Sequence, residues 1–448
     1  MPAPAPRAEE TFPPPRWNAR LLLTQPHRLC FAAAGLVWAA SACFWGLALL
    51  LPPPAAAGVP ATTLHALAFT LGPMPLFFAG FLFTSAPKWL RRPELATAAL
   101  APGVGAVVTG WLLALAIGPW SSVAAGLGLV LCALGWAVLW LQLVSLRRGA
   151  TRPSRHFDAI ATVCGLVVLA LAAAALALLR ERPDAARELA RTAFWAAVLP
   201  VFLLASHRLL PFLSHADAPQ PDRDDPQRDA WWVPALPLAA SVLQALASWS
   251  GLDPELAARA WPIHVLLPGA AGLLTLWLAL RWASHPATRS PLLHLLLRAF
   301  AWSGAAWIAL AISALPLLPP SLHAAFEAAA LHAMALGFAG GTMLAMVSRL
   351  SAAQAGQSQA VDRLARRLEG LLQLLLAARL LAAFVPATAA WALPLAALLW
   401  AGLALAWLRR HGGLAGRPRT RPAGAARRKA SAPAPDRLSA SDRGLGGK

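Results

Sequence analysis

Long apolar stretches separated by short polar segments recur along the whole 448-residue chain. Many of them reach 18 residues or more, which is enough for a helix to cross the ~30 Å hydrocarbon core of a bilayer. In lipid the backbone groups must be satisfied within the membrane, so long unbroken runs predict helices, whereas alternating ten-residue segments would predict a barrel. The pattern therefore predicts an all-α, polytopic membrane bundle.

Twelve spans are predicted, six on either side of a polar segment rich in Pro, Asp and Arg. They lie near 29–51, 65–84, 100–117, 123–144, 159–179, 192–213, 232–249, 263–280, 295–317, 325–347, 368–384 and 393–408. The membrane domain, 29–408, is thus expected as two halves, 29–213 and 232–408, joined by a cytoplasmic linker at 214–231. The polar, Pro-rich residues 1–28 and the basic residues 409–448 are predicted to be disordered tails.

Lysine and arginine fall mainly on one side of this arrangement. With both termini in the cytoplasm, the residues left outside are six of the 38: Arg180, Arg182, Arg187, Arg191, Arg259 and Arg379. Cytoplasmic loops carry an excess of Lys and Arg, so the bias supports both the orientation and an even number of spans. The net charge of +19 then reflects topology and attraction to anionic lipid, and no nucleic-acid partner is expected. The alternative is a basic tail that binds RNA or a cytoplasmic partner.

Composition supports a membrane class and offers little soluble chemistry. Charged residues make up 13% of the chain, about half of what a soluble domain carries. The four cysteines lie in apolar surroundings without a CxxC pair, which predicts buried thiols rather than a disulfide framework. No phosphate-binding loop or Rossmann fingerprint is present, and Glu327, at the outer edge of its span, is the acidic residue nearest to an intramembrane position.

Two histidines open apolar runs in the same sequence context. Leu64-His65-Ala66-Leu67-Ala68 is echoed by Leu331-His332-Ala333-Met334-Ala335, and the topology places both at outer helix ends. Polar side chains at membrane depth usually face the bundle interior, and a neutral imidazole is a common ligand of metals and of haem iron. His264 and His323 lack the shared context. A plain hydrogen-bonded histidine remains the alternative for each one.

The helices that carry these histidines have further features. Pro73 and Pro75 predict a kink just beyond His65. On the other helix, 100° per residue places one stripe of residues together and makes a separate small-residue edge that would let a neighbouring helix approach closely. The stripe comprises His332, Leu336, Ala339, Met343 and Met346, and the edge comprises Gly337, Gly341 and Ala345.

Three collinear segments resemble signatures of the NnrS family, which are twelve-span bacterial membrane proteins with haem and copper, associated with the response to nitric oxide. The first comprises His65-Ala66, Gly72, Ala79-Gly80-Phe81-Leu82, Thr84, Pro87 and Trp89. The second is Arg208-Leu209-Leu210-Pro211-Phe212, which resembles an Arg-x-x-Pro-Phe segment. The third comprises His332-Ala333, Gly337, Gly340-Gly341, Leu344, Arg349 and Gly356.

The resemblance implies a multi-pass protein of the bacterial inner membrane in which His65 and His332 supply imidazoles to haem, at one centre or at two. Arg208 and Arg349 lie at inner helix ends and are expected to have structural roles. Where the family carries further histidines, this chain has Leu67, Leu297 and Gln354, with Ala68 in place of a glutamate. If those histidines hold copper in the family, this chain has lost ligands for it.

The leading hypothesis is therefore an NnrS-like membrane protein that binds haem and lessens nitric oxide stress, with the lipid bilayer and nitric oxide or another small molecule as its partners. The alternative is a small-molecule or metal transporter, or a cofactor-less membrane assembly partner. Division into six and six spans suits a transporter, whereas the scarcity of intramembrane charge does not. The sequence does not assign catalysis to any residue.

Overall fold

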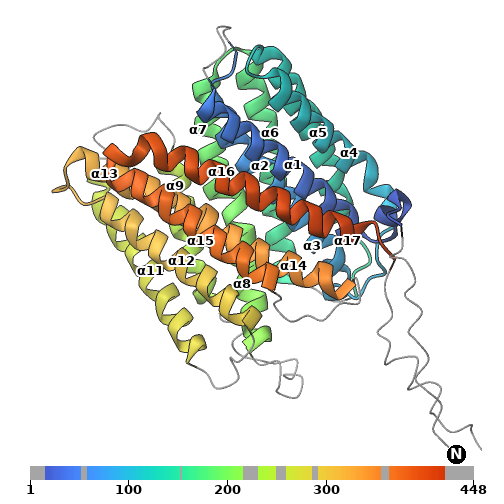
Figure 1. The fold of residues 1–448 in the computed structure, drawn as a ribbon. Coiled ribbons are helices and arrows are strands. Elements are labelled where there is room, and N and C mark those ends of the chain that lie inside the picture. Colours follow the sequence, from blue (N-terminus) through green and yellow to red (C-terminus); the bar gives the residue numbers. More distant parts are fainter. Residues whose placement is uncertain are drawn as a thin grey trace, which may run out of the picture.

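The computed structural model describes residues 16–51, 58–151, 154–214, 231–248, 259–284, 291–354 and 363–418. All regular secondary structure in these residues is helical, and the helices form one bundle (Figure 1). The prediction of an all-α fold is confirmed. The predicted linker, apart from its two ends, and residues 1–15 and 419–448 lie outside the described residues.

The first half of the bundle contains α1 (Pro26–Leu50), α2 (Ala61–Leu71), α3 (Pro73–Trp89), α4 (Ala101–Ile117), α5 (Ser122–Ser145), α6 (Arg155–Leu179), α7 (Pro183–Ala193), the π-helix η3 (Phe194–Val198) and α8 (Leu199–Ser214). The second half contains α9 (Trp232–Ala247), α11 (Trp261–Ala283), α12 (Pro291–Ser313), α13 (Pro320–His332), the π-helix η4 (Ala333–Gly340), α14 (Gly341–Gln354), α15 (Arg363–Phe384), α16 (Ala389–Trp407), the π-helix η6 (Leu408–Gly412) and α17 (Gly413–Ala415).

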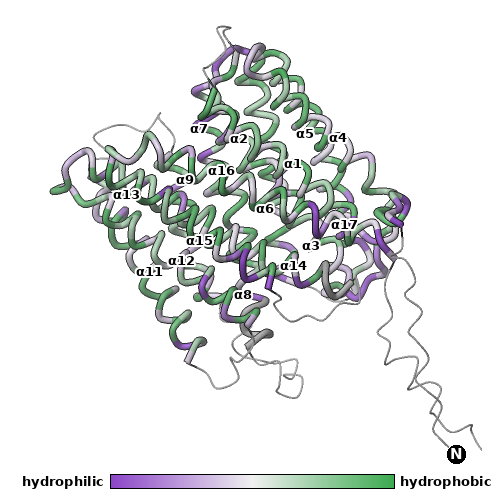
Figure 2. The backbone as a smooth tube through the Cα atoms, viewed as in Figure 1, coloured by the Kyte–Doolittle hydropathy of each residue, from purple (hydrophilic) through white to green (hydrophobic). Residues whose placement is uncertain are grey.

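Ten helical segments of the described chain are long and apolar enough to cross a membrane. They make this a polytopic membrane protein, and Figure 2 shows hydrophobic residues along the helix bodies with hydrophilic ones mainly near their ends. The two remaining predicted spans correspond to α9, which has 16 residues, and to α15, which carries five charged residues. The count of twelve spans therefore stays a prediction.

The two ends of the bundle's chain meet. The indole nitrogen of Trp17 donates to the carbonyl of Gly412, and Arg28 Nη1 donates to the carbonyls of Ala415 at 3.1 Å and Arg417 at 2.9 Å. These contacts place both ends on one face of the bundle, as an even number of crossings requires. The helical structure also continues beyond the predicted limits of 29 and 408. Before residue 29 it includes η1 (Ala19–Thr24), and after residue 408 it includes η6.

Three spans form the interior of the bundle, and all three are irregular helices. They are α2–α3, α7–η3–α8 and α13–η4–α14, whose most apolar windows are 78%, 72% and 67% buried. The windows of the other seven spans are between 33% and 56% buried. Less buried helices thus surround three inner spans whose helical ladder is interrupted.

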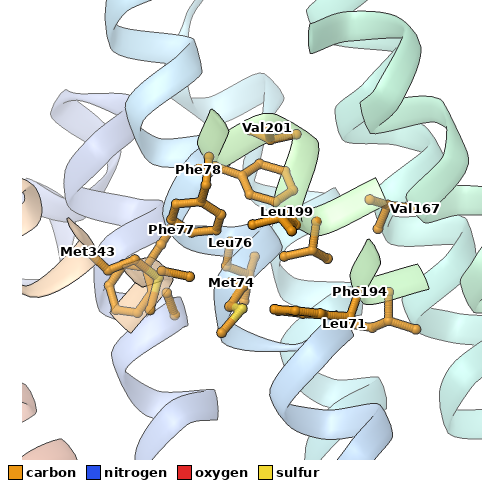
Figure 3. Packing of buried hydrophobic residues seen from close by; sticks show 14 of the residues in the cluster. Leu71, Met74, Leu76, Phe77, Phe78, Val167, Phe194, Leu199, Val201 and Met343 are labelled. Carbon is orange, nitrogen blue, oxygen red and sulfur yellow. The ribbon is translucent and has the colours of Figure 1, made fainter. Parts of the chain in front are cut away.

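The interruptions have local causes. Pro73 and Pro75 lack the N–H groups that would continue α2, so the predicted kink appears as a break at Gly72. The π turns of η3 and η4 each insert extra residues into a helix that continues on both sides. Side chains from the three inner spans, among them Phe78, Leu199 and Met343, belong to one apolar core (Figure 3). The ring centroids of Phe78 and Phe202 lie 6.5 Å apart.

Candidate functional site

His332 is the last residue of α13 and has both ring nitrogens engaged. Its Nδ1 lies 2.8 Å from the carbonyl oxygen of Ala328, one turn earlier. A carbonyl can only accept, so Nδ1 carries the hydrogen. The other nitrogen, Nε2, accepts a hydrogen bond of 3.2 Å from Nε of Arg379 on α15. These partners fix a neutral imidazole whose Nε2 lone pair points at Arg379.

His65 lies one turn into α2 between aromatic rings. Trp45 of α1 stacks on its imidazole with ring centroids 4.1 Å apart, and Phe69 lies 4.8 Å away on the other side of the helix turn. The Nδ1 atom of His65 is buried and has no hydrogen-bond partner in the described structure. Buried polar atoms nearly always have a hydrogen-bond partner, so a partner from outside the described residues is expected for this nitrogen.

The structure brings the two predicted histidines together. The charge of Arg379 acts on both imidazoles, and His65 acts electrostatically on His332. We call the group formed by Trp45, His65, Phe69, His332 and Arg379 the outer histidine site. The site lies at the end of the bundle opposite to the two chain ends. Helices α1 and α15 begin near the chain ends, and their last turns carry Trp45 and Arg379 into the site.

The potential ligand atoms of this site are two imidazole nitrogens, which fits a metal group that needs only imidazole ligands from the protein. A metal-ligating histidine commonly donates its second N–H to a carbonyl, which fixes the tautomer and presents the other lone pair, and Nδ1 of His332 is held in this way. His65 adds a buried nitrogen without a partner. No group of three or more His, Cys, Asp or Glu side chains that could hold a metal occurs in the described residues. Two imidazoles suit the axial positions of haem and are too few for a closed three- or four-ligand metal site.

The positions at which the family resemblance leads one to expect histidine are packed as apolar core. Leu67 is completely buried and Leu297 is 5% exposed. The side chain of Gln354 lies outside the described part of the molecule. The substitutions at 67 and 297 therefore leave no polar gap that a metal would fill.

The residues predicted to have structural roles lie apart from the outer histidine site. The guanidinium of Arg208 stacks over the Trp89 ring at 4.5 Å, joining α8 to the end of α3. Pro211 and Phe212 follow Arg208 within α8. Arg349 is half-buried on α14.

The small-residue edge is a contact with α12. A Cβ on Gly337 would meet Trp302 Cγ at 2.6 Å, and one on Gly341 would meet Ala299 Cβ at 3.0 Å. The predicted stripe on this helix assumes 100° per residue, and that assumption is wrong here because η4 is a π-helix over Ala333–Gly340.

Sequence reasoning missed Arg379, which it counted only as one of six outer positive charges. It also missed a partly buried chain of polar contacts between α12 and α15. Trp302 Nε1 donates to Gln373, whose amide donates to Glu369 at 3.0 Å, and Arg298 Nη1 lies 3.1 Å from Glu369. A signal was available for Arg298, which stands several residues inside the apolar helix α12.

A second histidine pair lies toward the end of the bundle that holds the termini. His156 Nε2 and His207 Nδ1 are 3.0 Å apart, and Trp231 packs against both rings. One imidazole donates to the other, so the pair is a hydrogen bond that joins α6 to α8. No spacing in the sequence links residues on these two helices.

Comparison with known proteins gives one family. The family model described as NnrS protein matches residues 21–419, which include every described helix from α1 to α17. None of the curated proteins compared matches the chain.

Proposed function

Because the chain belongs to the NnrS family, we propose that this polytopic membrane protein binds haem through His65 and His332, in the inner membrane of a bacterium, and acts in the response to nitric oxide. Family membership and the ten membrane-length helices support the general class. The haem and nitric oxide parts of the proposal rest on the outer histidine site.

The observation that carries the proposal is the state of the two imidazoles. His332 is held in the tautomer that presents Nε2, while His65 has a buried nitrogen that no residue of the described structure satisfies. His65 and His332 would be the residues that hold the haem, because imidazole nitrogens are common ligands of haem iron.

His65 and His332 would hold the haem, which would supply affinity for nitric oxide only where one of the two imidazoles gives up its place. The chain itself orients His332 through Ala328 and holds the plane of His65 against Trp45. Phe69, one turn later on α2, lies beside the same ring. A copper centre is not part of the proposal, because Leu67 and Leu297 fill apolar core positions.

The absorption spectrum of the purified protein tests this function. We expect a Soret band in the wild type that is strongly reduced in His65→Ala and in His332→Ala. His264→Ala is the matched control, because His264 lies at the start of α11 and has no contact with the outer histidine site in the described structure. A colourless wild type after expression with ample haem would contradict the proposal.

A transporter or a cofactor-less assembly partner is the second candidate, and one observation favours a transporter. The three inner spans are broken or π-helical, which is typical of helices that line a transport path. The same spectrum separates the two candidates, since a transporter with both histidines intact would be colourless.

A further inference from the structure

Arg379 brings a positive charge into the outer histidine site, and no carboxylate among the described residues pairs with it. In the described residues its one hydrogen bond is to the neutral imidazole of His332. An imidazole that accepts through Nε2 satisfies one N–H of the guanidinium and contributes no opposite charge. Arg379 is half-buried, and withdrawing a cation from water costs free energy unless an anion accompanies it.

The carboxylates nearest along the chain are already engaged elsewhere. The helices that carry the site residues are α1, α2, α13 and α15, and together they contain two acidic residues, Glu327 and Glu369. Glu327 forms an ion pair with Arg191 of α7. Glu369 pairs with Arg298 of α12 and accepts a hydrogen bond from Gln373. Neither pairs with Arg379 in the described structure.

The unused part of the guanidinium has a defined chemical preference. Arg379 donates through Nε to His332, which leaves its two Nη groups as a planar fork of donors. Such a fork matches the two oxygens of a carboxylate or of a planar oxyanion and binds them through paired, charge-assisted hydrogen bonds. A neutral ligand would leave the charge unbalanced.

We propose that the outer histidine site binds an anion, either a carboxylate or a small planar oxyanion, with Arg379 as its charged anchor. His332 is the resting partner of Arg379 and competes with the anion for the guanidinium. The anion therefore draws Arg379 away from Nε2 of His332 and frees that lone pair. By linkage, whatever else binds Nε2 also favours anion binding, and to the same degree.

Calorimetric titration of the detergent-solubilised, haem-free full-length protein tests the anion site. Nitrate serves as the planar oxyanion and propionate as the carboxylate. The anion that binds with the lower dissociation constant identifies which of the two classes the site prefers. Arg379→Gln is expected to weaken binding about 10- to 100-fold, the loss of one charge-assisted partner. Arg180→Gln is the matched control, because Arg180 is an exposed arginine in the loop after α6.

A second variant gives a change of opposite sign. His332→Ala removes the group that competes for Arg379, so it is expected to bind the same anion about tenfold more tightly than the wild type. A gain in affinity cannot arise from misfolding, which guards against an unstable Arg379→Gln protein.

The inference is overturned if neither anion binds the wild type, or if binding survives in Arg379→Gln at wild-type affinity. It is also overturned if His332→Ala binds the anion no more tightly than the wild type. Haem takes no part in this measurement, so its outcome is independent of whether the purified protein shows a Soret band.

Discussion

Replacing Gly337 by alanine should destabilise the bundle through one identified collision. Gly337 lies in η4, where the inner span packs on α12. An added Cβ would lie 2.6 Å from Cγ and 2.7 Å from Cβ of Trp302. These atoms are close to the backbone of α12 and cannot swing aside as the end of a flexible chain would. Ordinary contact would require Trp302 to move by close to 1 Å.

The magnitude follows from three terms. Overpacking of this kind costs about 1–3 kcal/mol. The displaced indole also strains its 2.9 Å hydrogen bond to Gln373, worth about 1 kcal/mol. Alanine gains about 1 kcal/mol over glycine in helix propensity, which offsets part of this loss. The net loss of unfolding free energy is therefore about 1–3 kcal/mol.

Three alanine variants test this packing by the order of their thermal stabilities. Gly341→Ala places its Cβ 3.0 Å from Ala299 Cβ and should cost less than Gly337→Ala. Gly370→Ala meets nothing within 4 Å and should be neutral or slightly stabilising. Thermal unfolding in detergent, followed by circular dichroism, gives the order. A Gly337→Ala protein as stable as Gly370→Ala would refute the packing of η4 against α12.

Two further predictions concern the ends of the helices and the thiols. A double-mutant cycle with Arg191→Gln and Glu327→Gln should give a coupling free energy of about 0.2–1 kcal/mol. Added salt should weaken this coupling, because the two side chains are 39% and 42% exposed. A coupling near zero in low salt would contradict the ion pair. In the folded, detergent-solubilised protein, a maleimide should label the half-buried Cys43. The buried thiols of Cys30, Cys132 and Cys164 should react only after denaturant is added, and labelling of these three in the folded protein would contradict their burial.

Hydrophobic patterning accounts for most of the fold. Membrane-length apolar runs predicted the helices, and Pro73 with Pro75 predicted the interruption that appears at Gly72. The π turn of η4 had no such signal, because its sequence contains no helix breaker and only the packing against α12 distinguishes it. The count of spans is the least determined part, since α9 is short and α15 is unusually polar for a membrane helix.

The candidate site was predictable only in part. The repeated context of His65 and His332 singled out both residues, and the structure brings them into electrostatic range. Their neighbours were not predictable, because Trp45 and Arg379 reach them from other helices. Arg379 stands 47 residues from His332 in sequence, and its contact depends on how α15 packs against α13. A side chain that touches a site through helix packing leaves no periodic signal.

The joint ligation of one haem by His65 and His332 is the central claim, and electron paramagnetic resonance of the ferric, haem-loaded protein tests it most directly. The account predicts one low-spin, bis-imidazole species in the wild type and in His264→Ala. Haem retained by either single variant should then be high-spin, since one axial nitrogen is missing. A wild-type spectrum that is high-spin, or that stays low-spin after the loss of either histidine, would contradict the account.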